Sequence, residues 1–367
     1  MKIIHCADLH LDSPMRTHLD AAKSKERKLE LLETFRRMVA YAQEQEVSAI
    51  LIAGDLFDCR NVSKPAMNAF LKQVETHPDI TFYYLRGNHD ATSLPLAEGL
   101  PENLKLFSDS WTRYVLNEDS AKQQIVLHGV EFNGSNENTI YDSLNLQVRD
   151  FNIVMLHGQT TAHNMGDRTE YIQTKKLADR GIDYLALGHV HSHVSEKIDS
   201  RGTYYFPGCL EGRGFDECGE HGFILLNVNE DAPGYTTEFV PFAQRRLYTV
   251  ETDVSTCMTS EEMRERVEQT LGGCNYPENS LIKIVLKGNI DVACEKDLSY
   301  ILHPFTGRYY FVKIEDDTRM QVDFRMYAFD ESLKGEFIRT VLGSDLSDEE
   351  KGEVIHYGLM ALRGDLS

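Results

Sequence analysis

Apolar runs alternate with helical stripes along the first ninety residues. Three short apolar runs predict buried strands over residues 2–7, 48–53 and 80–85. Between them, apolar side chains recur at the three- and four-residue spacing of one helix face. This spacing predicts one helix over 21–45 and a second that begins after an N-cap, Ser63. The β-α-β-α-β order implies a parallel sheet with helices on its faces.

The middle of the chain is richer in strands. Residues 111–134 predict strands and turns without long helices, and a buried strand over 151–156, a helix over 171–179 and a strand over 184–187 follow. Three consecutive antiparallel strands are then expected, at 193–198, 204–207 and 223–228. Two facing sheets with outer helices would accommodate both this region and the one before it.

A change of pattern near residues 241–246 predicts a second domain. Strand, helix, strand, short helix and strand are expected at 247–254, 260–271, 281–286, 295–302 and 308–314. No cluster of ligand-type residues occurs in this stretch. The last segment is predicted to be helical, with a capping box formed by Ser347 and Glu350. We therefore expect three parts, residues 1–243, 244–328 and 329–367.

Composition narrows the class of protein. The 367 residues are 41% hydrophobic and 26% charged, which is typical of globular proteins. We find no signal peptide and no apolar run that could span a membrane, so we expect a cytoplasmic protein. The seven cysteines include no C-x-x-C pair, which argues against a disulfide framework or a zinc ribbon. The net charge of −20 argues against a free-standing nucleic-acid binder.

Polar residues with metal-ligand chemistry follow five of the predicted strands. They are Asp8, His10, Asp55, Asn88, His89, His157, His189 and His191. Side chains two residues apart on a strand share a face, so His189 and His191 should point the same way. A lone Asp-x-His or Gly-Asp pair is usually a turn. The repetition at successive strand ends, where open α/β sheets bind their ligands, is the specific signal.

The donor set indicates which metals would bind. Carboxylates, one amide oxygen and several imidazoles, without a thiolate, suit Mn²⁺, Fe²⁺ or Zn²⁺. The donors are too many for one ion and suit two ions that share a bridging carboxylate. Two divalent cations would outweigh Asp8 and Asp55, so the site would attract a phosphate and activate water, as two-metal hydrolases do.

Five motifs of the chain resemble, in the same order, those of the calcineurin-like metallophosphoesterase superfamily. They are Asp8-Leu9-His10, Gly54-Asp55 with Asp58, Gly87-Asn88-His89-Asp90, His157-Gly158 and Gly188-His189-Val190-His191. Within that superfamily, residues 7–14, 54–58 and 206–208 are similar to SbcD-type DNA repair exonucleases. The resemblance implies an α/β four-layer sandwich of two mixed β-sheets flanked by helices. A small βαβαβ capping domain and a helical C-terminal tail would follow.

The resemblance also implies roles for the residues. Asp8, His10, Asp55 and His191 would hold one metal ion. The other ion would be held by Asp55, which bridges, with Asn88, His157 and His189. His89 would contact the scissile phosphate and act as general acid to the leaving oxygen. Asp58 stands where some members carry histidine, and we expect it to orient a ligand histidine from behind.

The function that this resemblance implies is Mn²⁺-dependent cleavage of DNA, as exonuclease and endonuclease, during double-strand break or end processing. The partners would be DNA and an SbcC-type, SMC-like ATPase, and a homodimer stays open. One alternative is a phosphatase or phosphodiesterase for a small or protein substrate, which the acidic charge favours. Another is a catalytically idle subunit that tethers DNA ends, against which the full ligand set counts.

The remaining candidates receive plainer interpretations. His5 should be a buried core residue with its hydrogen bonds satisfied, and His193 a surface residue or a neighbour of the ligands. Five basic residues are expected to be solvated surface charges rather than phosphate contacts: Lys175, Lys176, Arg213, Arg245 and Arg246. The apolar stripe of Ile355, Leu359 and Leu362 could dock a partner or pack on its own domain.

Overall fold

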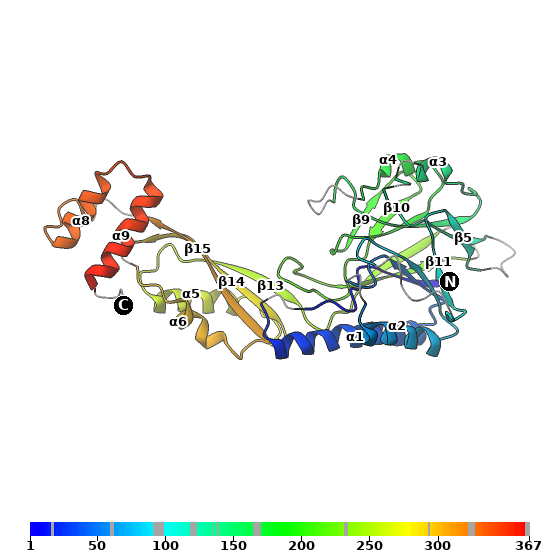
Figure 1. Cartoon of the computed structure of the whole chain (residues 1–367), viewed down its shortest axis with the longest axis horizontal. Helices are drawn as coiled ribbons and strands as arrows, with labels where there is room; N and C mark the ends of the chain where they lie inside the picture. Colours follow the sequence, from blue (N-terminus) through cyan, green and yellow to red (C-terminus); the bar gives the residue numbers. More distant parts are fainter. Residues whose placement is uncertain are drawn as a thin grey trace. The chain divides into compact units, whose positions relative to one another are not determined.

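The computed structural model describes residues 1–15, 18–58, 62–90, 99–117, 123–134, 136–137, 139–163, 170–230, 234–292, 294–321 and 327–363. The chain divides into two compact units, Met1–Arg246 and Leu247–Ser367 (Figure 1). The division into three parts that the sequence suggests stays a prediction. Among the described residues, no helix combines the length and the apolar character needed to cross a bilayer.

Two six-stranded mixed sheets form the first unit. The first sheet has the order β12 (Tyr235–Pro241), β11 (Gly222–Val228), β1 (Lys2–Cys6), β2 (Ala49–Ala53), β3 (Thr81–Leu85) and β4 (Leu104–Leu106). The second has the order β5 (Thr112–Val115), β6 (Ile125–Gly129), β7 (Phe151–His157), β8 (Tyr184–Gly188), β10 (Thr203–Phe206) and β9 (Val194–Lys197). Strands β1 to β4 are parallel, as are β6, β7, β8 and β10.

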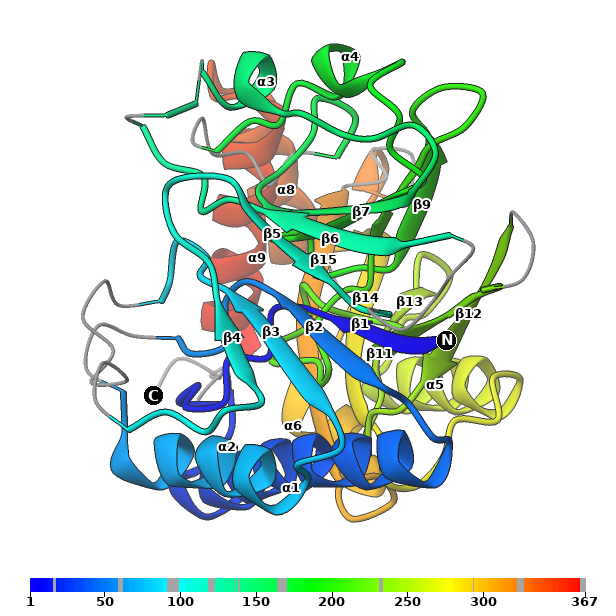
Figure 2. The same ribbon diagram turned by 90° about the vertical axis from the view of Figure 1, so that its right-hand side faces the viewer.

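Helices cover the outer face of each sheet. The first sheet carries α1 (Ala21–Glu44) and α2 (Lys64–Thr76), and the second carries α3 (Ile140–Ser143) and α4 (Thr174–Leu177) (Figure 2). A central core fills the space between the sheets, with Leu51 from one sheet and Ile153 from the other. The predicted four-layer sandwich is therefore confirmed.

Local sequence explains these elements. Strand β7 is buried along its whole length, because it lies between a sheet and helices, and this explains its apolar run over 153–156. Asp20 caps the N-terminus of helix α1, because its side chain accepts a hydrogen bond from Lys23 N at 2.8 Å. Helix α2 begins at the predicted cap, Ser63, which accepts from Ala66 N.

Two expectations for this unit are wrong. The helix predicted over 171–179 is only the single turn α4, because Tyr171 bridges Gln159 and Ile172 N donates to Gln159 O at 2.8 Å, which holds this backbone extended. Strand β11 does not continue the antiparallel pair of β9 and β10. It crosses to the first sheet and pairs with β1 and β12, where Phe223 and Ile224 are buried on opposite faces.

The second unit contains a parallel three-stranded sheet of β13 (Leu247–Asp253), β14 (Leu281–Asp291) and β15 (Phe311–Gln321). Helices α5 (Ser260–Gly272) and α6 (Leu298–Leu302), with the 3-10 turn η1 (His303–Phe305), pack on one face (Figure 1). The predicted βαβαβ order is confirmed. Strands β14 and β15 run past their predicted ends because polar residues continue the ladder, where Lys287 lies opposite Asp317.

Two helices, α8 (Leu333–Leu342) and α9 (Asp348–Arg363), end the second unit. The predicted capping box is present: Ser347 N donates to Glu350 Oε2 at 2.9 Å, and Glu350 N donates to Ser347 Oγ at 3.3 Å. Of the apolar stripe on α9, Ile355 and Leu359 are buried within this unit, whereas Leu362 is exposed. The stripe is therefore mainly part of the unit's own core.

Candidate metal centre

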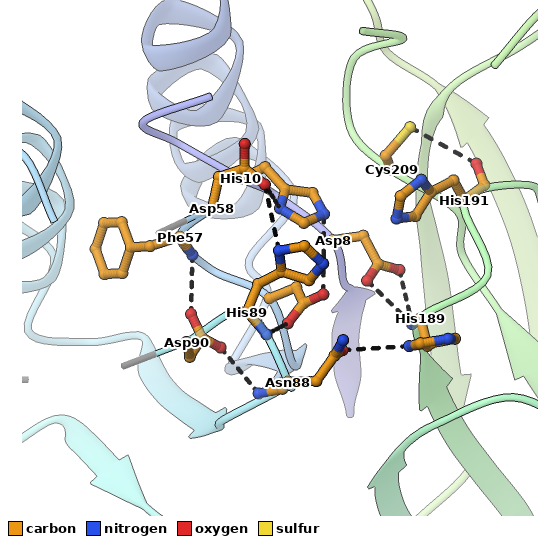
Figure 3. Close-up of polar contacts among 12 residues, drawn as sticks. Asp8, His10, Phe57, Asp58, Asn88, His89, Asp90, His189, His191 and Cys209 are labelled. Carbon is orange, nitrogen blue, oxygen red and sulfur yellow. Dashed lines mark hydrogen bonds and ion pairs between the residues drawn. The ribbon is translucent and has the colours of Figure 1, made fainter. Parts of the chain in front are cut away.

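The predicted ligands lie together at or just beyond the C-terminal ends of β1, β2, β3, β7 and β8. Figure 3 shows five of them: Asp8, His10, Asn88, His189 and His191. The backbone there is unusual. Asp8, His10, Asp55 and His189 have φ angles of 52°, 43°, 52° and 99°. Non-glycine residues rarely adopt this left-handed region, and such strain often accompanies functional sites. Hydrogen bonds hold it in place, because Asp8 N donates to Gly54 O at 3.1 Å and His10 N to Asp55 O at 3.0 Å.

Two glycines let the loops approach one another. A Cβ atom on Gly54, whose φ is +96°, would lie 2.0 Å from His157 Nδ1. A Cβ atom on Gly188 would lie 2.0 Å from the carbonyl oxygen of Ala53. Glycine is therefore required at both positions for the histidines of β7 and β8 to reach the loop after β2.

One group of donors comprises Asp8, His10 and His191, whose candidate ligand atoms lie within 4.8 Å of one another. Both carboxylate oxygens of Asp8 accept from His189 N at 3.0 Å. The Nε2 atom of His10 is buried and has no hydrogen-bond partner among the described residues. Its nearest carboxylate is Asp55, with Oδ2 at 3.9 Å. A buried imidazole nitrogen that faces carboxylates in this way fits a cation.

A second group lies around His157. Its Nδ1 is 2.9 Å from the carbonyl of Ala53, which can only accept, so the proton belongs on Nδ1 and the Nε2 lone pair is free. That Nε2 atom lies 2.9 Å from Asn88 Oδ1 and 3.5 Å from Asp55 Oδ2, and Asn88 Oδ1 lies 3.3 Å from His189 Nδ1. Several acceptor atoms therefore face one another, an arrangement that a bound cation would stabilise.

The electrostatics agree with a cation site. Burial alone would lower the pKa of His157, but the charges of Asp55 and Asp8 raise it to about 9. Burial likewise would raise the pKa of Asp55, but the neighbouring His157 and His10 lower it. Asp55 lies between the two groups, because its Oδ2 faces both His157 and His10. This is the position that a bridging ligand requires.

His89 borders the cluster and is 48% exposed. Its backbone N–H donates to Asp55 Oδ1 at 3.0 Å. Its Nδ1 atom lies 3.5 Å from Asp58 Oδ1, and the same oxygen lies 3.1 Å from Nδ1 of His10 (Figure 3). The structure thus brings all the candidate residues together and puts Asp58 behind His10. The individual metal-ligand and general-acid roles stay predictions.

Two residues beside the candidate ligands, Arg213 and Glu217, were not predicted from the sequence to belong to the site. Arg213 was expected to be a solvated charge, and this is wrong: it is 19% exposed and contacts Asp58 and Glu217 at 3.3 and 2.9 Å. Glu217 Oε1 lies 2.7 Å from His191 Nδ1. Burial would raise the pKa of Glu217, but hydrogen bonds from His191 and Arg213 hold it far below its usual value. No periodic pattern marks this loop, so the sequence offered no signal.

Two further acidic residues lie nearby. Asp90, which ends the Gly87-Asn88-His89-Asp90 motif, accepts from Phe57 N and Gly87 N at 2.9 Å and so ties two ligand loops together. Burial and the charge of Asp55 raise its pKa to about 6. Glu170 Oε2 lies 3.8 Å from His189 Nδ1, and its carboxylate, His157 and His189 form a third potential metal-binding group.

The expectations for the other histidines and for the basic residues are confirmed in part. His5 is a satisfied core residue, with Nδ1 2.8 Å from the Tyr184 hydroxyl and Nε2 3.2 Å from Leu187 O. His193 is exposed and stacks on Phe239. Lys175 and Lys176 are exposed, and Arg246 pairs with Glu220 at the surface. Arg245 differs from expectation, because it is mostly buried against Glu30 and Glu26.

Comparison with known proteins places these observations in a family. Residues 1–193 match the family model described as "Calcineurin-like phosphoesterase". The chain is 30% identical over 244 residues to the "Uncharacterized metallophosphoesterase YhaO" of Bacillus subtilis, covering 64% of this chain and 59% of that protein.

Two proteins named for DNA double-strand break repair are also similar to this chain. The "DNA double-strand break repair protein Mre11" of Haloferax volcanii is 27% identical over 281 residues, which are 73% of this chain and 58% of that protein. Its namesake from Saccharolobus solfataricus is 23% identical over 355 residues, 89% of this chain and 85% of that protein. The chain thus spans about three fifths of the Bacillus and Haloferax relatives. It belongs to the calcineurin-like phosphoesterase family, which comprises metal-dependent phosphoester hydrolases with two-metal sites.

Proposed function

We propose that this protein is a two-metal phosphodiesterase that cleaves DNA, as exonuclease and endonuclease, in the processing of DNA ends. The observation that carries the proposal is the gathering of imidazole, carboxylate and amide donors around Asp55. Relatives named for DNA double-strand break repair support DNA as the substrate. The similarity to the Saccharolobus relative covers 89% of the chain and so extends past Arg246, the last residue of the first unit.

The ligand assignment follows from the two groups of donors. Asp8, His10, Asp55 and His191 would hold one ion. The second ion would be held by Asp55, Asn88, His157 and His189. We propose Mn²⁺ for both positions, and Fe²⁺ or Zn²⁺ would suit the same nitrogen and oxygen donors.

The assignment predicts that His189 and His191, although two residues apart, serve different ions. In a Mn²⁺ titration of the full chain, His189→Ala should weaken one binding event and His191→Ala the other. Removal of a metal-binding imidazole leaves the other ion with its own donors, so we expect one high-affinity site to persist in each variant. Identical metal losses from the two variants would contradict the assignment.

The residues around the ions would divide the chemistry. Two divalent cations bound there would offset phosphate charge and lower the pKa of a water molecule. His89 would donate a proton to the leaving oxygen, because its ring borders the cluster and remains accessible from solvent. Asp58, at 3.5 Å from His89 Nδ1, would stabilise the protonated ring. The hydrogen bond from His89 N to Asp55 would hold this acid at a fixed distance from the bridging carboxylate.

The test is cleavage of a labelled DNA duplex with Mn²⁺ by the parent chain and by His89→Ala. The variant should bind both ions and lose cleavage by about 10²- to 10⁴-fold, the usual contribution of general acid catalysis. His163→Ala is the control, because His163 pairs with Glu196 and belongs to none of the potential metal-binding groups. If His89→Ala cleaves as fast as the parent, the acid role is wrong.

A phosphatase or phosphodiesterase for small or protein substrates is the second candidate. The net charge of −20 favours it, because an acidic surface repels the DNA backbone. Turnover of a nitrophenyl phosphodiester and a nitrophenyl phosphomonoester, compared with cleavage of the duplex, separates the two. Rapid hydrolysis of an ester without any DNA cleavage would support this candidate and contradict the nuclease.

We also propose an SbcC-type, SMC-like ATPase as partner, with a homodimer as the alternative assembly. Ile355 and Leu359 are buried, so the docking residues would instead be exposed apolar side chains of α8 and α9, which include Leu333, Val354 and Tyr357. Co-purification of the ATPase with the parent chain, but not with Tyr357→Glu, would support this assignment. Equal retention by both would refute it.

A further inference from the structure

One guanidinium joins the carboxylates that lie behind two different histidines. Arg213 Nη1 lies 3.3 Å from Asp58 Oδ1, and Nη2 lies 2.9 Å from Glu217 Oε1. These same two oxygens face the candidate ligands: Asp58 Oδ1 is 3.1 Å from His10 Nδ1, and Glu217 Oε1 is 2.7 Å from His191 Nδ1. The chain His10–Asp58–Arg213–Glu217–His191 is therefore continuous, and Arg213 Nη2 also lies 3.1 Å from His191 Nδ1 itself.

This arrangement fixes two imidazoles at once. A carboxylate beside Nδ1 favours the proton on that atom, orients the ring and leaves Nε2 for a cation. The rings of His10 and His191 lie 5.3 Å apart at 79°. Arginine suits the linking position because its planar fork can bond two carboxylates in fixed directions.

The surroundings of the other histidines differ. His157 Nδ1 faces the neutral carbonyl of Ala53 at 2.9 Å rather than a carboxylate. His189 is held through its backbone, which donates to Asp8. Among the described residues, the two candidate ions would thus have different supports, because two carboxylates joined by an arginine lie behind the ligands of the ion between His10 and His191.

The segment that carries Arg213 is itself held firmly. Arg213 N donates to Glu217 Oε2 at 2.7 Å. The preceding residue, Gly212, accepts at its carbonyl from the buried Arg27 of α1 at 3.0 Å. The guanidinium is therefore fixed from the backbone as well as through its ion pairs.

We propose that Arg213 is a positioning residue that sets the affinity for the ion held by His10 and His191 and leaves the other ion unaffected. The proposal rests on the two-metal function proposed above. Loss of Arg213 frees Asp58 and Glu217 to turn away from their histidines. Removal of such outer partners typically weakens metal binding by about 10- to 100-fold.

The experiment is calorimetric titration of the chelator-stripped full chain with Mn²⁺ alone. The parent chain should bind two ions. Arg213→Ala should bind one ion as the parent does and the other about 10- to 100-fold more weakly. Arg201→Ala is the matched control, since Arg201 also forks onto a carboxylate, Asp183, at 2.8 and 2.6 Å but lies before β10, outside the ligand loops. It should leave both affinities unchanged.

Electron paramagnetic resonance reports directly whether the two ions lie side by side. At two equivalents of Mn²⁺, the parent should give the signal of a spin-coupled ion pair. Arg213→Ala at the same loading should give the six-line signal of isolated Mn²⁺. Arg213→Lys keeps the charge but lacks the fork, so its weaker site should lie between those of the parent and Arg213→Ala.

The outcomes separate the two proposals. If the parent binds fewer than two ions, the proposed two-metal function fails. If the parent binds two ions and Arg213→Ala binds both with parental affinity, or weakens both equally, the role of Arg213 is overturned. Should Arg213→Ala fail to fold, Glu217→Gln decides: selective loss of one ion supports the proposal, and unchanged binding overturns it.

Discussion

A buried ion pair links α1 to the loop that carries Arg213, and its strength can be measured without any metal. Arg27 is 1% exposed, and its Nη2 atom lies 3.1 Å from Glu211 Oε2. Glu211 also accepts from Thr34 Oγ1 and from Gln244 N, both at 2.7 Å. Arg27→Met keeps much of the apolar side chain but leaves the Glu211 carboxylate buried without its cation. The first unit should therefore lose stability.

The structure sets the expected size of this loss. Removal of one partner from a buried ion pair costs about 3–5 kcal/mol, because the remaining charge is uncompensated. Glu211 keeps two hydrogen bonds, so we expect a loss near the lower end, about 3 kcal/mol. Arg36 on the same helix is the matched control. It pairs with Glu33 of the same helix, and the two side chains are 55% and 43% exposed. Arg36→Met should leave the urea midpoint close to that of the parent, because an exposed ion pair contributes little to stability.

The assay is urea unfolding followed by tryptophan fluorescence. Trp111 is the only tryptophan of the chain and lies in the first unit, where its indole N–H donates to Ile140 O at 2.9 Å. The signal therefore reports unfolding of the first unit and not of the second. A lower urea midpoint with an unchanged denaturant slope would indicate a true loss of stability.

A double variant separates the charge effect from packing. Arg27→Met with Glu211→Gln removes both charges, and the second change should recover part of the stability that the first one lost. If Arg27→Met and Arg36→Met lower the midpoint equally, the buried pair has no special role. If the double variant is as unstable as the sum of the single ones, an uncompensated charge is not the cause.

Two further predictions concern single positions. Burial lowers the pKa of His5 from 6.5 to about 3, so the unfolded chain alone takes up this proton between those values. The free energy of unfolding should therefore fall as the pH is lowered from about 6.5 to about 3, by up to about 1.4 kcal/mol per pH unit for this group. Urea titrations should show a shallower fall for His5→Gln, and an equal fall would refute the assignment. Gly54→Ala should displace His157 and weaken Mn²⁺ binding in calorimetry. Gly134→Ala, where a Cβ has open space, should not, and equal effects would contradict the steric argument.

Much of the site could be predicted because its ligands follow recognisable strands. Asp8 and Asp55 come two residues after buried apolar runs, and His157 ends one. Parallel strands put their C-terminal ends at one edge of a sheet, which brings Asp8 and Asp55 together. His157 joins them because the second sheet packs face to face with the first. The fold class followed from the same runs and from the helical stripes between them.

The rest depended on contacts between distant segments. Arg213 lies in a loop without strand or helix periodicity, and its partner Asp58 is 155 positions away in the chain. Nothing local distinguishes it from a surface arginine such as Arg246. The extended backbone at Tyr171 likewise depends on its bridge to Gln159 rather than on local propensity, which is why a helix was wrongly expected there.

The acidic composition and a phosphate substrate are compatible only through the bound cations. Among the described residues, the carboxylates of Asp8 and Asp55 lie in the cluster, and those of Asp58 and Glu217 pair with the guanidinium of Arg213. Without cations this group is net negative and would repel a phosphate, as would the surface of a chain with a net charge of −20. Two bound divalent ions would offset most of this negative charge at the ligands themselves. Metal binding and recognition of the scissile phosphate would then be one event, which restricts cleavage to the edge of the sheets where the ligands meet.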